Sequence, residues 1–172
     1  MFGRAKVPGP LRSAFGPEER LLGLAEQDDR AVAATQLGLW LPVADAAGWR
    51  RLGWHCIVKA TWTEAGLEVI EGEVDEAGLV SDLAPVRYRL CEPRNLPQVV
   101  RQRVERSIGR WEQVRVPGGT GRIVGRRAPG VDGIQWTARI DSGTPDSAEA
   151  RQVLLGYLVR VRALPAEQTT DF

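Results

Sequence analysis

The sequence has little of the residue types that most often build metal and nucleophilic sites. Its 172 residues include one histidine, His55, and two cysteines, Cys56 and Cys91. One histidine cannot supply a metal cluster, and neither cysteine is spaced from it as in a known zinc pattern. A G-x-S-x-G elbow for nucleophilic catalysis is also missing. We therefore expect a protein that is not an enzyme and that holds no metal and no cofactor.

The two cysteines are also too few for a disulfide framework. Each lies on the apolar side of a strand pattern, so we expect both thiols to be buried. A disulfide between Cys56 and Cys91 stays open, because their strands could be neighbours.

Long apolar runs and a strong net charge are lacking too. No run approaches the roughly 18 residues that span a bilayer, and no apolar segment follows Arg4 and Lys6 as in a signal peptide. We therefore expect no membrane span and a cytoplasmic location. The net charge of +1 gives no overall attraction to nucleic acid or anionic membrane. Two lysines stand against 21 arginines, a skew that indicates a GC-rich bacterial genome.

The strongest pattern that is present has a period of two. From residue 51 to residue 63 every even-numbered position is apolar, which is typical of a half-buried β-strand. We expect the even face, with Trp54 and Trp62, to lie in the core. The odd face is expected on the surface and carries three side chains of basic type, Arg51, His55 and Lys59.

Shorter periodic segments on both sides predict further elements. Strands are expected over residues 21–26, 30–35, 37–41, 67–73, 78–83, 85–91, 122–127 and 134–140. A helix is predicted over residues 95–111 from five apolar positions at helical spacing, Leu96, Val100, Val104, Ile108 and Trp111. The Gly-rich stretch 118–121 is expected to be a flexible loop, with a weak anion nest as the alternative. A second helix is predicted from Thr144 to Pro165.

Two stretches resemble a known superfold. Residues 33–40, AATQLGLW, look like the second-to-third-strand segment of bacterial pleckstrin-homology-like domains, and residues 51–57 look like the strand that follows. The whole chain is similar to a family of uncharacterised actinobacterial proteins. The resemblance implies an α+β fold, an antiparallel two-sheet barrel or sandwich capped by a helix. The phosphoinositide site of such domains is not carried over, because Asp28 and Asp29 occupy the hairpin turn where basic residues would bind the lipid.

The expected organisation has four parts. Residues 1–16 form a tail that Leu11 and Phe15 could pin, residues 17–112 form the pleckstrin-homology-like domain, and residues 113–164 form a ββα extension packed on it. Residues 165–172 are expected to fray.

Charge is uneven along the chain. Residues 64–82 carry seven acids and no base: Glu64, Glu68, Glu71, Glu73, Asp75, Glu76 and Asp82. Residues 94–127 carry nine arginines against Glu105 and Glu112: Arg94, Arg101, Arg103, Arg106, Arg110, Arg115, Arg122, Arg126 and Arg127. The two runs are either solvated faces that pair with each other or, for the second, a basic surface that holds phosphate. Nucleic acid would also need an aromatic stacking platform, and the only nearby candidate, Trp111, is expected on an apolar stripe.

The function expected from the sequence is a non-enzymatic binding or scaffold module. A protein partner is favoured, at a sheet edge or at a surface of Trp and Arg, and Trp40 and Trp49 would mark that surface if exposed. Nucleic-acid or phospholigand binding through residues 94–127 is the alternative. A third hypothesis is an enzyme with a carboxylate site around Glu68, Glu71 or Glu73. Self-association stays open. The candidate binding residues are Trp49, Arg51, His55, Lys59, Arg101, Arg106, Arg110, Arg122, Arg126 and Arg127.

Overall fold

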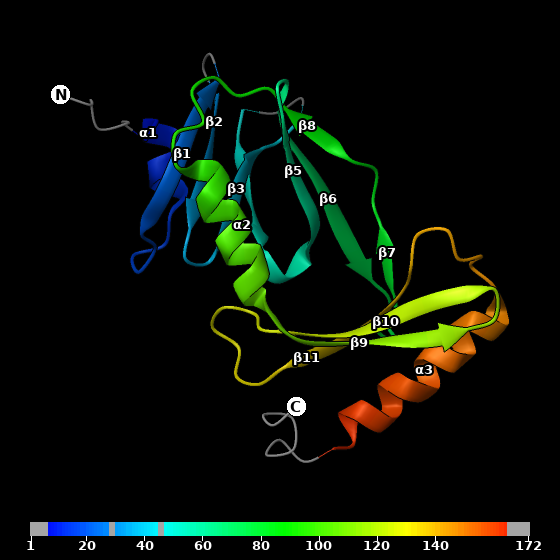
Figure 1. Ribbon diagram of the computed structural model, residues 1–172. Helices are drawn as coiled ribbons and strands as arrows, with labels where there is room; N and C mark the ends of the chain where they lie inside the picture. The colour runs from blue at the N-terminus through cyan, green and yellow to red at the C-terminus, as the bar shows by residue number, and fades with distance from the viewer. Residues whose placement is uncertain (1–6, 28–29, 45–46, 165–172) are drawn as a thin grey trace. The chain divides into compact units, whose positions relative to one another are not determined.

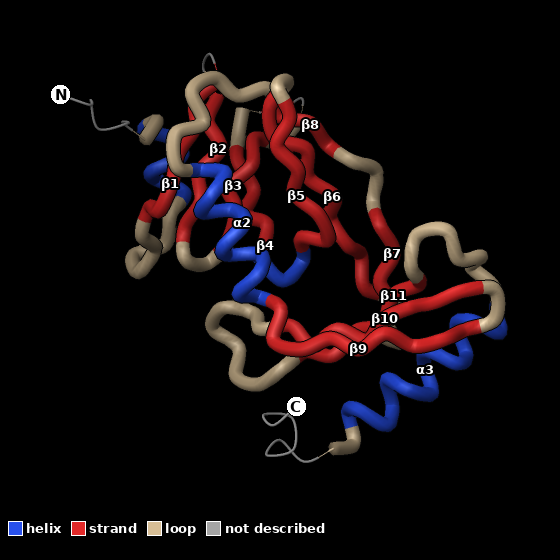
Figure 2. Tube along the Cα trace, viewed as in Figure 1, coloured by secondary structure: helices blue, strands red, loops and turns tan. Residues whose placement is uncertain are grey.

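The chain folds into two compact units (Figures 1 and 2). The computed structural model describes three stretches, residues 7–27, 30–44 and 47–164. The first unit comprises Met1–Glu71 and Ala84–Glu105, and the second comprises Gly72–Leu83 and Arg106–Phe172. Both units are discontinuous in sequence, whereas the predicted domain and extension are continuous.

A four-stranded antiparallel sheet begins the first unit. Its strands, in spatial order, are β1 (Leu21–Gln27), β2 (Arg30–Thr35), β3 (Gly38–Pro42) and β4 (Trp49–Gly53). All five residues of β2 that follow Arg30 are buried, so both faces of this sheet are covered. Three of those five are alanines, whose small side chains let neighbouring layers approach closely on both sides.

A short helix, α1 (Gly9–Ala14), covers one face of this sheet. Leu11 is fully buried in a cluster with Leu24, Ala31 and Trp40. The Phe15 ring lies 5.5 Å from the Trp40 ring, centroid to centroid. Pinning of this segment by Leu11 and Phe15 is therefore confirmed.

The other face packs on a second sheet and on a helix. The second sheet contains β5 (Ile57–Thr63), β6 (Gly66–Val74) and β8 (Val86–Tyr88), and the helix is α2 (Leu96–Ser107). Leu96 and Val100 of α2 share one buried cluster with Leu39, Trp54 and Ile57. The period of 3.6 that predicted α2 thus marks the face of the helix that enters the core.

The second unit is a three-stranded antiparallel sheet with one helix on it. The strands lie in the order β11 (Gln135–Ile140), β10 (Gly119–Arg126) and β9 (Ile108–Val116), and α3 (Ala148–Arg162) covers one face (Figure 1). Leu154 of α3 packs so closely that a Cβ on Gly121 would lie 2.8 Å from its Cδ1. β7 (Val80–Asp82) pairs with the last residues of β6, and Leu79 forms a parallel bridge with Ala138 of β11.

The α+β class is confirmed, with three antiparallel sheets and a C-terminal helix packed on the last of them. The extension, expected to hold two strands, has three, because the segment read as the end of a helix and a Gly loop is strand β9 and the start of β10. α2 ends at Ser107, four residues before the predicted end. Pro117 and Gly118, with φ of +82° at Gly118, make the tight turn between β9 and β10.

The predicted continuous strand from residue 51 to residue 63 is also wrong. A 3-10 turn, η1 (Trp54–Cys56), separates β4 from β5, which belong to different sheets. The turn carries Trp54 into the core, where its side chain is 2% exposed and its Nε1 donates to the Thr35 carbonyl at 3.1 Å. The even-numbered Leu52 of β4 is buried, and Ala60 and Trp62 of β5 pack against the same core, but the fully buried residue of β5 is the odd-numbered Ile57.

The cysteines differ from expectation in one respect. Cys56 is half-buried, but Cys91 is exposed, so its predicted burial is wrong. The two thiols are not joined by a disulfide. The predicted turn at Asp28 and Asp29 and the tail from residue 165 lie outside the described residues, and within the described residues no helix is long and apolar enough to cross a membrane.

Candidate binding surface

The sheet of the second unit has two chemically different faces. Side chains on directly opposed residues of an antiparallel pair share one face. Ile123 lies opposite Glu112 and Ala138, and Gly125 lies opposite Arg110 and Trp136, on the face that α3 covers. The other face, here called the outer face of the β9–β11 sheet, carries Thr120, Arg122, Val124 and Arg126 of β10, Trp111, Gln113 and Arg115 of β9, and Gln135, Thr137 and Arg139 of β11.

Trp111 is the most exposed aromatic residue described on this face. Its relative exposure is 61%, so its predicted place on a buried apolar stripe is wrong. The guanidinium carbon of Arg122 lies 5.8 Å from the centre of the Trp111 ring. At that distance a cation is attracted to the face of an indole. The sheet therefore presents an aromatic plane and a positive charge side by side.

Arg122 is held in place from its other side by Asp141. Its Nε donates to Asp141 Oδ1 at 2.6 Å, and Asp141 Oδ2 accepts from Thr120 Oγ1 at 2.8 Å and from Gln113 Nε2 at 3.4 Å. Burial alone would raise the pKa of Asp141, but these three hydrogen bonds and the charge of Arg122 hold the pKa below its usual value. The carboxylate is therefore ionised near neutral pH, and it orients Arg122 beside the indole.

Like charges meet across the outer face. Arg122 lies directly opposite Arg139 of β11, a pairing that is unfavourable without a counter-charge. Each guanidinium has its own carboxylate, Asp141 for Arg122 and Asp82 of β7 for Arg139. Two of the four arginines on the outer face, Arg122 and Arg139, are thus paired with carboxylates beside the exposed Trp111, which reduces the positive charge of the face.

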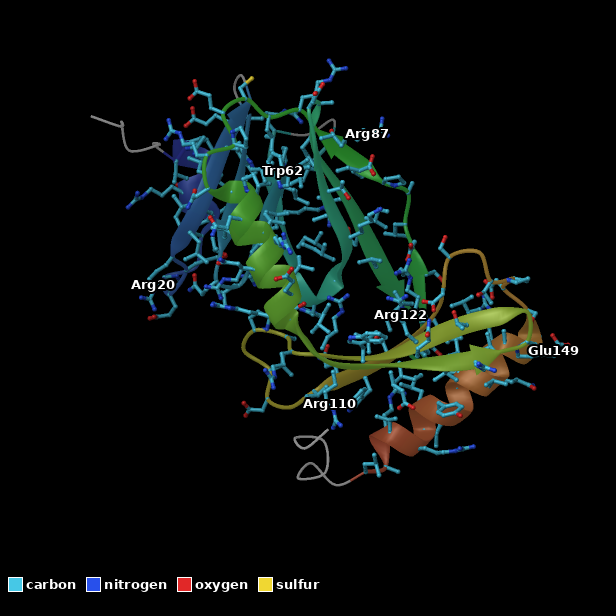
Figure 3. The ribbon with its side chains drawn as sticks, viewed as in Figure 1. Arg20, Trp62, Arg87, Arg110, Arg122 and Glu149 are labelled. Carbon is cyan, nitrogen blue, oxygen red and sulfur yellow. The ribbon has the colours of Figure 1, made fainter. Side chains whose placement is uncertain are left out.

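The other candidate arginines of the predicted basic surface do not all lie on the outer face. Arg126 shares the outer face with Arg122, and its guanidinium donates to Ser107 Oγ at 3.0 Å. Arg110 lies on the α3 face of β9, opposite Gly125, and Figure 3 labels it on the other side of the sheet from Arg122. Arg127 follows β10 and lines a pocket near the end of α3. Arg106 lies in the last turn of α2, and Arg101 of the first unit pairs with Glu105 at 2.8 Å.

The candidates of the first unit do not form a row on one strand. Arg51 is on β4 and Lys59 on β5, in different sheets, and His55 lies in η1 between them. The His55 ring folds back on Gly53, where a Cβ would lie 2.6 Å from its Cε1. Trp49 is half-buried and donates from Nε1 to the Ala31 carbonyl at 2.7 Å. Both side chains thus make contacts within the first unit: the His55 ring packs against Gly53, and Trp49 is hydrogen-bonded to β2.

A buried carboxylate that the sequence analysis missed organises this part of the first unit. The Glu19 side chain has no exposed surface, and its Oε1 accepts from Thr35 Oγ1 at 2.6 Å and from Trp40 Nε1 at 2.7 Å. Its Oε2 accepts from the Gly16 amide at 3.2 Å and lies 3.4 Å from Arg51 Nη1. Burial raises the pKa of Glu19, but these hydrogen bonds and the charge of Arg51 bring it below its usual value. Trp40, which was considered as a partner surface, is consequently buried at 8% exposure.

The acidic run pairs with arginines that lie outside the basic run. Glu68 accepts from Arg87 at 2.6 Å and Glu71 from Arg50 at 2.7 Å. Within the described stretches of chain, no group of three His, Cys, Asp or Glu side chains could hold a metal ion. Two of the three carboxylates considered for chemistry are therefore engaged in ion pairs.

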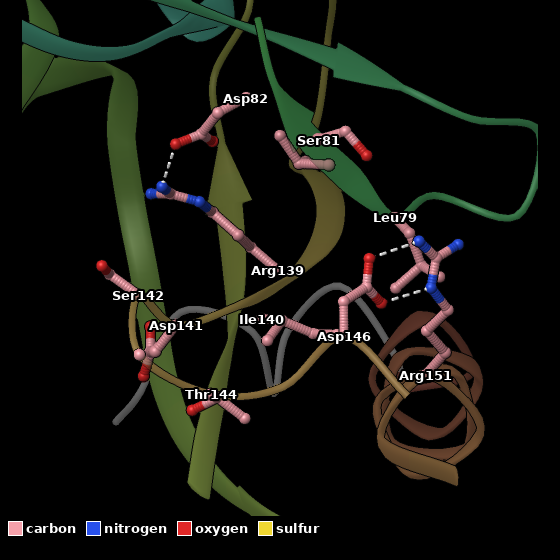
Figure 4. A pocket seen from close by; sticks show the side chains of 12 residues that line it. Leu79, Ser81, Asp82, Arg139, Ile140, Asp141, Ser142, Thr144, Asp146 and Arg151 are labelled. Atoms are coloured by element: carbon pink, nitrogen blue, oxygen red, sulfur yellow. Dashed lines mark hydrogen bonds and ion pairs between the residues drawn. The ribbon is translucent and has the colours of Figure 1, made fainter. Parts of the chain in front are cut away.

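A pocket of about 320 Å³ lies beside the outer face, between β7, β11 and the start of α3 (Figure 4). Arg139 pairs with Asp82 and Arg151 pairs with Asp146, with an Arg151 Nε to Asp146 Oδ1 distance of 2.6 Å. The third carboxylate of its lining, Asp141, pairs with Arg122. Each charged side chain of the lining is thus engaged in an ion pair, so the pocket offers no unpaired charged group to an ionic ligand.

In comparisons with known proteins, the chain matches no family model, no curated protein and no solved structure.

Proposed function

We propose that the protein is a non-enzymatic binding module that takes a protein partner on the outer face of the β9–β11 sheet. The observation that carries this proposal is Trp111, 61% exposed with the Arg122 guanidinium 5.8 Å from its ring. Exposing an indole to water is unfavourable, and Trp and Arg are the residues that most often dominate binding energy at protein interfaces. Of the two partner sites expected from the sequence, a Trp and Arg surface is the one these contacts support.

The fixed position of Arg122 supports binding as well. Ordering a long side chain at an interface costs roughly 0.5–1.5 kcal/mol. The hydrogen bond to Asp141 and the stacking on Trp111 already meet that cost in the free protein. Arg122 is then ready to meet a carboxylate or carbonyl of the partner.

The test compares proteins captured by the wild type and by two variants. Trp111→Ala removes the anchor, and Val159→Ala on α3, where Val159 is 66% exposed, is the matched control for losing an exposed apolar side chain. Capture from extract of the source cell after nuclease treatment, quantified by mass spectrometry, should recover one set of proteins with the wild type and the control and lose it with Trp111→Ala. Equal capture by Trp111→Ala would refute the proposal.

Single-stranded nucleic acid is a second candidate because Trp111 now meets the requirement for a stacking platform. Base stacking on an aromatic side chain is worth roughly 1–3 kcal/mol. The carboxylates of Asp82 and Asp141 offset the charge of two of the four arginines on the outer face, which weakens its attraction for phosphate. Titration of labelled RNA and DNA oligonucleotides over a range of salt concentrations separates the two candidates. Binding that weakens steeply with salt would favour nucleic acid over a protein partner.

We also infer that the first unit is a pleckstrin-homology-like barrel in a bacterial, cytoplasmic protein. Beyond the resemblance of residues 33–40 and 51–57, one contact supports a closed barrel. An antiparallel bridge joins Glu26 of β1 to Cys91 after β8, with the Cys91 amide 3.0 Å from the Glu26 carbonyl. Closing a barrel requires such pairing between its first and last strands. Protection of the Cys91 amide from hydrogen exchange is expected, and rapid exchange would contradict closure.

A further inference from the structure

β9 is a long strand at the edge of its sheet. It runs nine residues, from Ile108 to Val116, and is last in the order β11-β10-β9. Among the described residues no strand pairs with its outer side. Such an edge presents a row of backbone N–H and C=O groups that can pair with another strand.

We propose that two copies of the chain pair through β9, antiparallel, about a twofold axis at Trp111. The product is a continuous six-stranded sheet with both α3 helices on one face. This inference goes beyond the proposed function and does not depend on it.

Charge selects the register. When a strand pairs with its own copy about such an axis, the opposed residues lie at equal distances on either side of the residue at the axis. With Trp111 at the axis, Arg110 of each copy lies opposite Glu112 of the other, which gives two opposite-charge pairs. With Arg110 or Glu112 at the axis, like charges oppose each other and pairing is disfavoured. A fourth register, with Gln113 at the axis, avoids like charges but forms neither ion pair.

The faces of β9 agree with this register. Arg110 and Glu112 lie on the α3 face, opposite Gly125 and Ile123, so their side chains would meet across the new strand pair. Arg110 already has a contact within its own chain, and the five N–H donors of a guanidinium leave enough for a second. The two Trp111 side chains would lie side by side on the outer face, where aromatic cross-strand pairs are favourable.

The other edge of the sheet explains why pairing would stop at two copies. β11 carries the parallel bridge between Ala138 and Leu79, with the Ala138 amide 2.9 Å from the Gly78 carbonyl. That edge is therefore partly occupied within the chain. Self-pairing of one edge about a twofold axis gives a closed dimer, whereas two open edges would give a fibre.

The test is the mass of the full chain by sedimentation equilibrium up to about 100 µM, a range that detects weak dimers. The wild type is expected to dimerise, and Glu112→Arg, which opposes arginines at two places, should weaken the dimer by about tenfold or more. The double variant Arg110→Glu with Glu112→Arg restores both pairs and should restore the dimer. Glu76→Arg, at an exposed turn between β6 and β7, is the charge-reversal control and should change nothing.

A monomeric wild type would overturn the proposal, and so would a dimer that Glu112→Arg leaves intact, because that dimer uses another register or surface. Circular dichroism of each variant separates loss of pairing from loss of fold. As a second readout, Trp111→Cys in a Cys91→Ser background should oxidise to a covalent dimer, because the two introduced thiols would face each other across the axis. A failure to crosslink would contradict the register.

Discussion

Replacing Glu19 by Gln tests whether its buried carboxylate stabilises the first unit. The amide keeps one carbonyl oxygen, which can still accept from Thr35 and Trp40. Its NH₂ group then faces the Gly16 amide and Arg51, both of which are donors. The Gly16 N–H loses its acceptor, at roughly 1–3 kcal/mol for a buried donor, and the remaining bonds lose the strength that charge gives them.

The expected loss of unfolding free energy at pH 7 is about 2 kcal/mol. In urea this lowers the unfolding midpoint by about 1 M, at a slope of about 2 kcal/mol per M. The matched control is Glu18→Gln, which removes the same charge from the exposed neighbouring residue and should shift the free energy by less than about 0.5 kcal/mol.

The pH dependence supplies a second check. The pKa of Glu19 is lower in the folded chain than in the unfolded chain. Its contribution is therefore present above the unfolded value of about 4.3 and is lost as the pH falls through the folded value. The stability gap between wild type and Glu19→Gln should narrow below about pH 4. Equal stability of the Glu19 and Glu18 variants at pH 7, or a gap that does not narrow in acid, would refute the reasoning.

Three further predictions concern the second unit and the thiols. Gly121→Ala should lower the unfolding free energy by about 1–3 kcal/mol, because its Cβ would clash with Leu154 of α3. Gly156→Ala has open space around its Cβ and should raise the unfolding free energy by about 0.5–1 kcal/mol through helix propensity. Urea unfolding measures both changes. Arg122→Ala should raise the pKa of Asp141, which NMR titration of the carboxyl carbon follows, and an unchanged pKa would contradict the ion pair. Cys91, being exposed, should react with a thiol reagent in the native state well before the second thiol, and equal rates would contradict its placement.

Periodicity predicted the elements whose pattern reports their own burial. The strand over residues 30–35 and the core face of α2 at Leu96 and Val100 agree with the structure. The alternation over residues 51–63 predicted one strand where the structure has two. A period of two indicates which residues face the core, but it carries no information on which sheet they belong to. The break at Trp54 therefore had no signal in the pattern.

The helix predicted to end at residue 111 concealed the candidate surface, because it placed Trp111 on a buried apolar stripe. Ile108 and Trp111 continue the helical spacing of α2, so they extended the predicted helix across the start of β9. Val114 and Val116, in strict alternation before Pro117-Gly118, were the signal of a strand and a hairpin turn. The roles of Asp141 and Glu19 could not be found in the sequence, because each acts through side chains 16 to 32 residues away.

Hydroxyl-radical footprinting of the intact chain, read at each tryptophan by mass spectrometry, tests the central claim most directly. In the isolated protein Trp111 should oxidise much faster than the buried Trp54. Nuclease-treated extract of the source cell should protect Trp111 and leave exposed side chains elsewhere on the second unit unprotected. A Trp111 that resists oxidation in the isolated protein, or that no extract protects, would contradict a protein-binding surface centred on this residue.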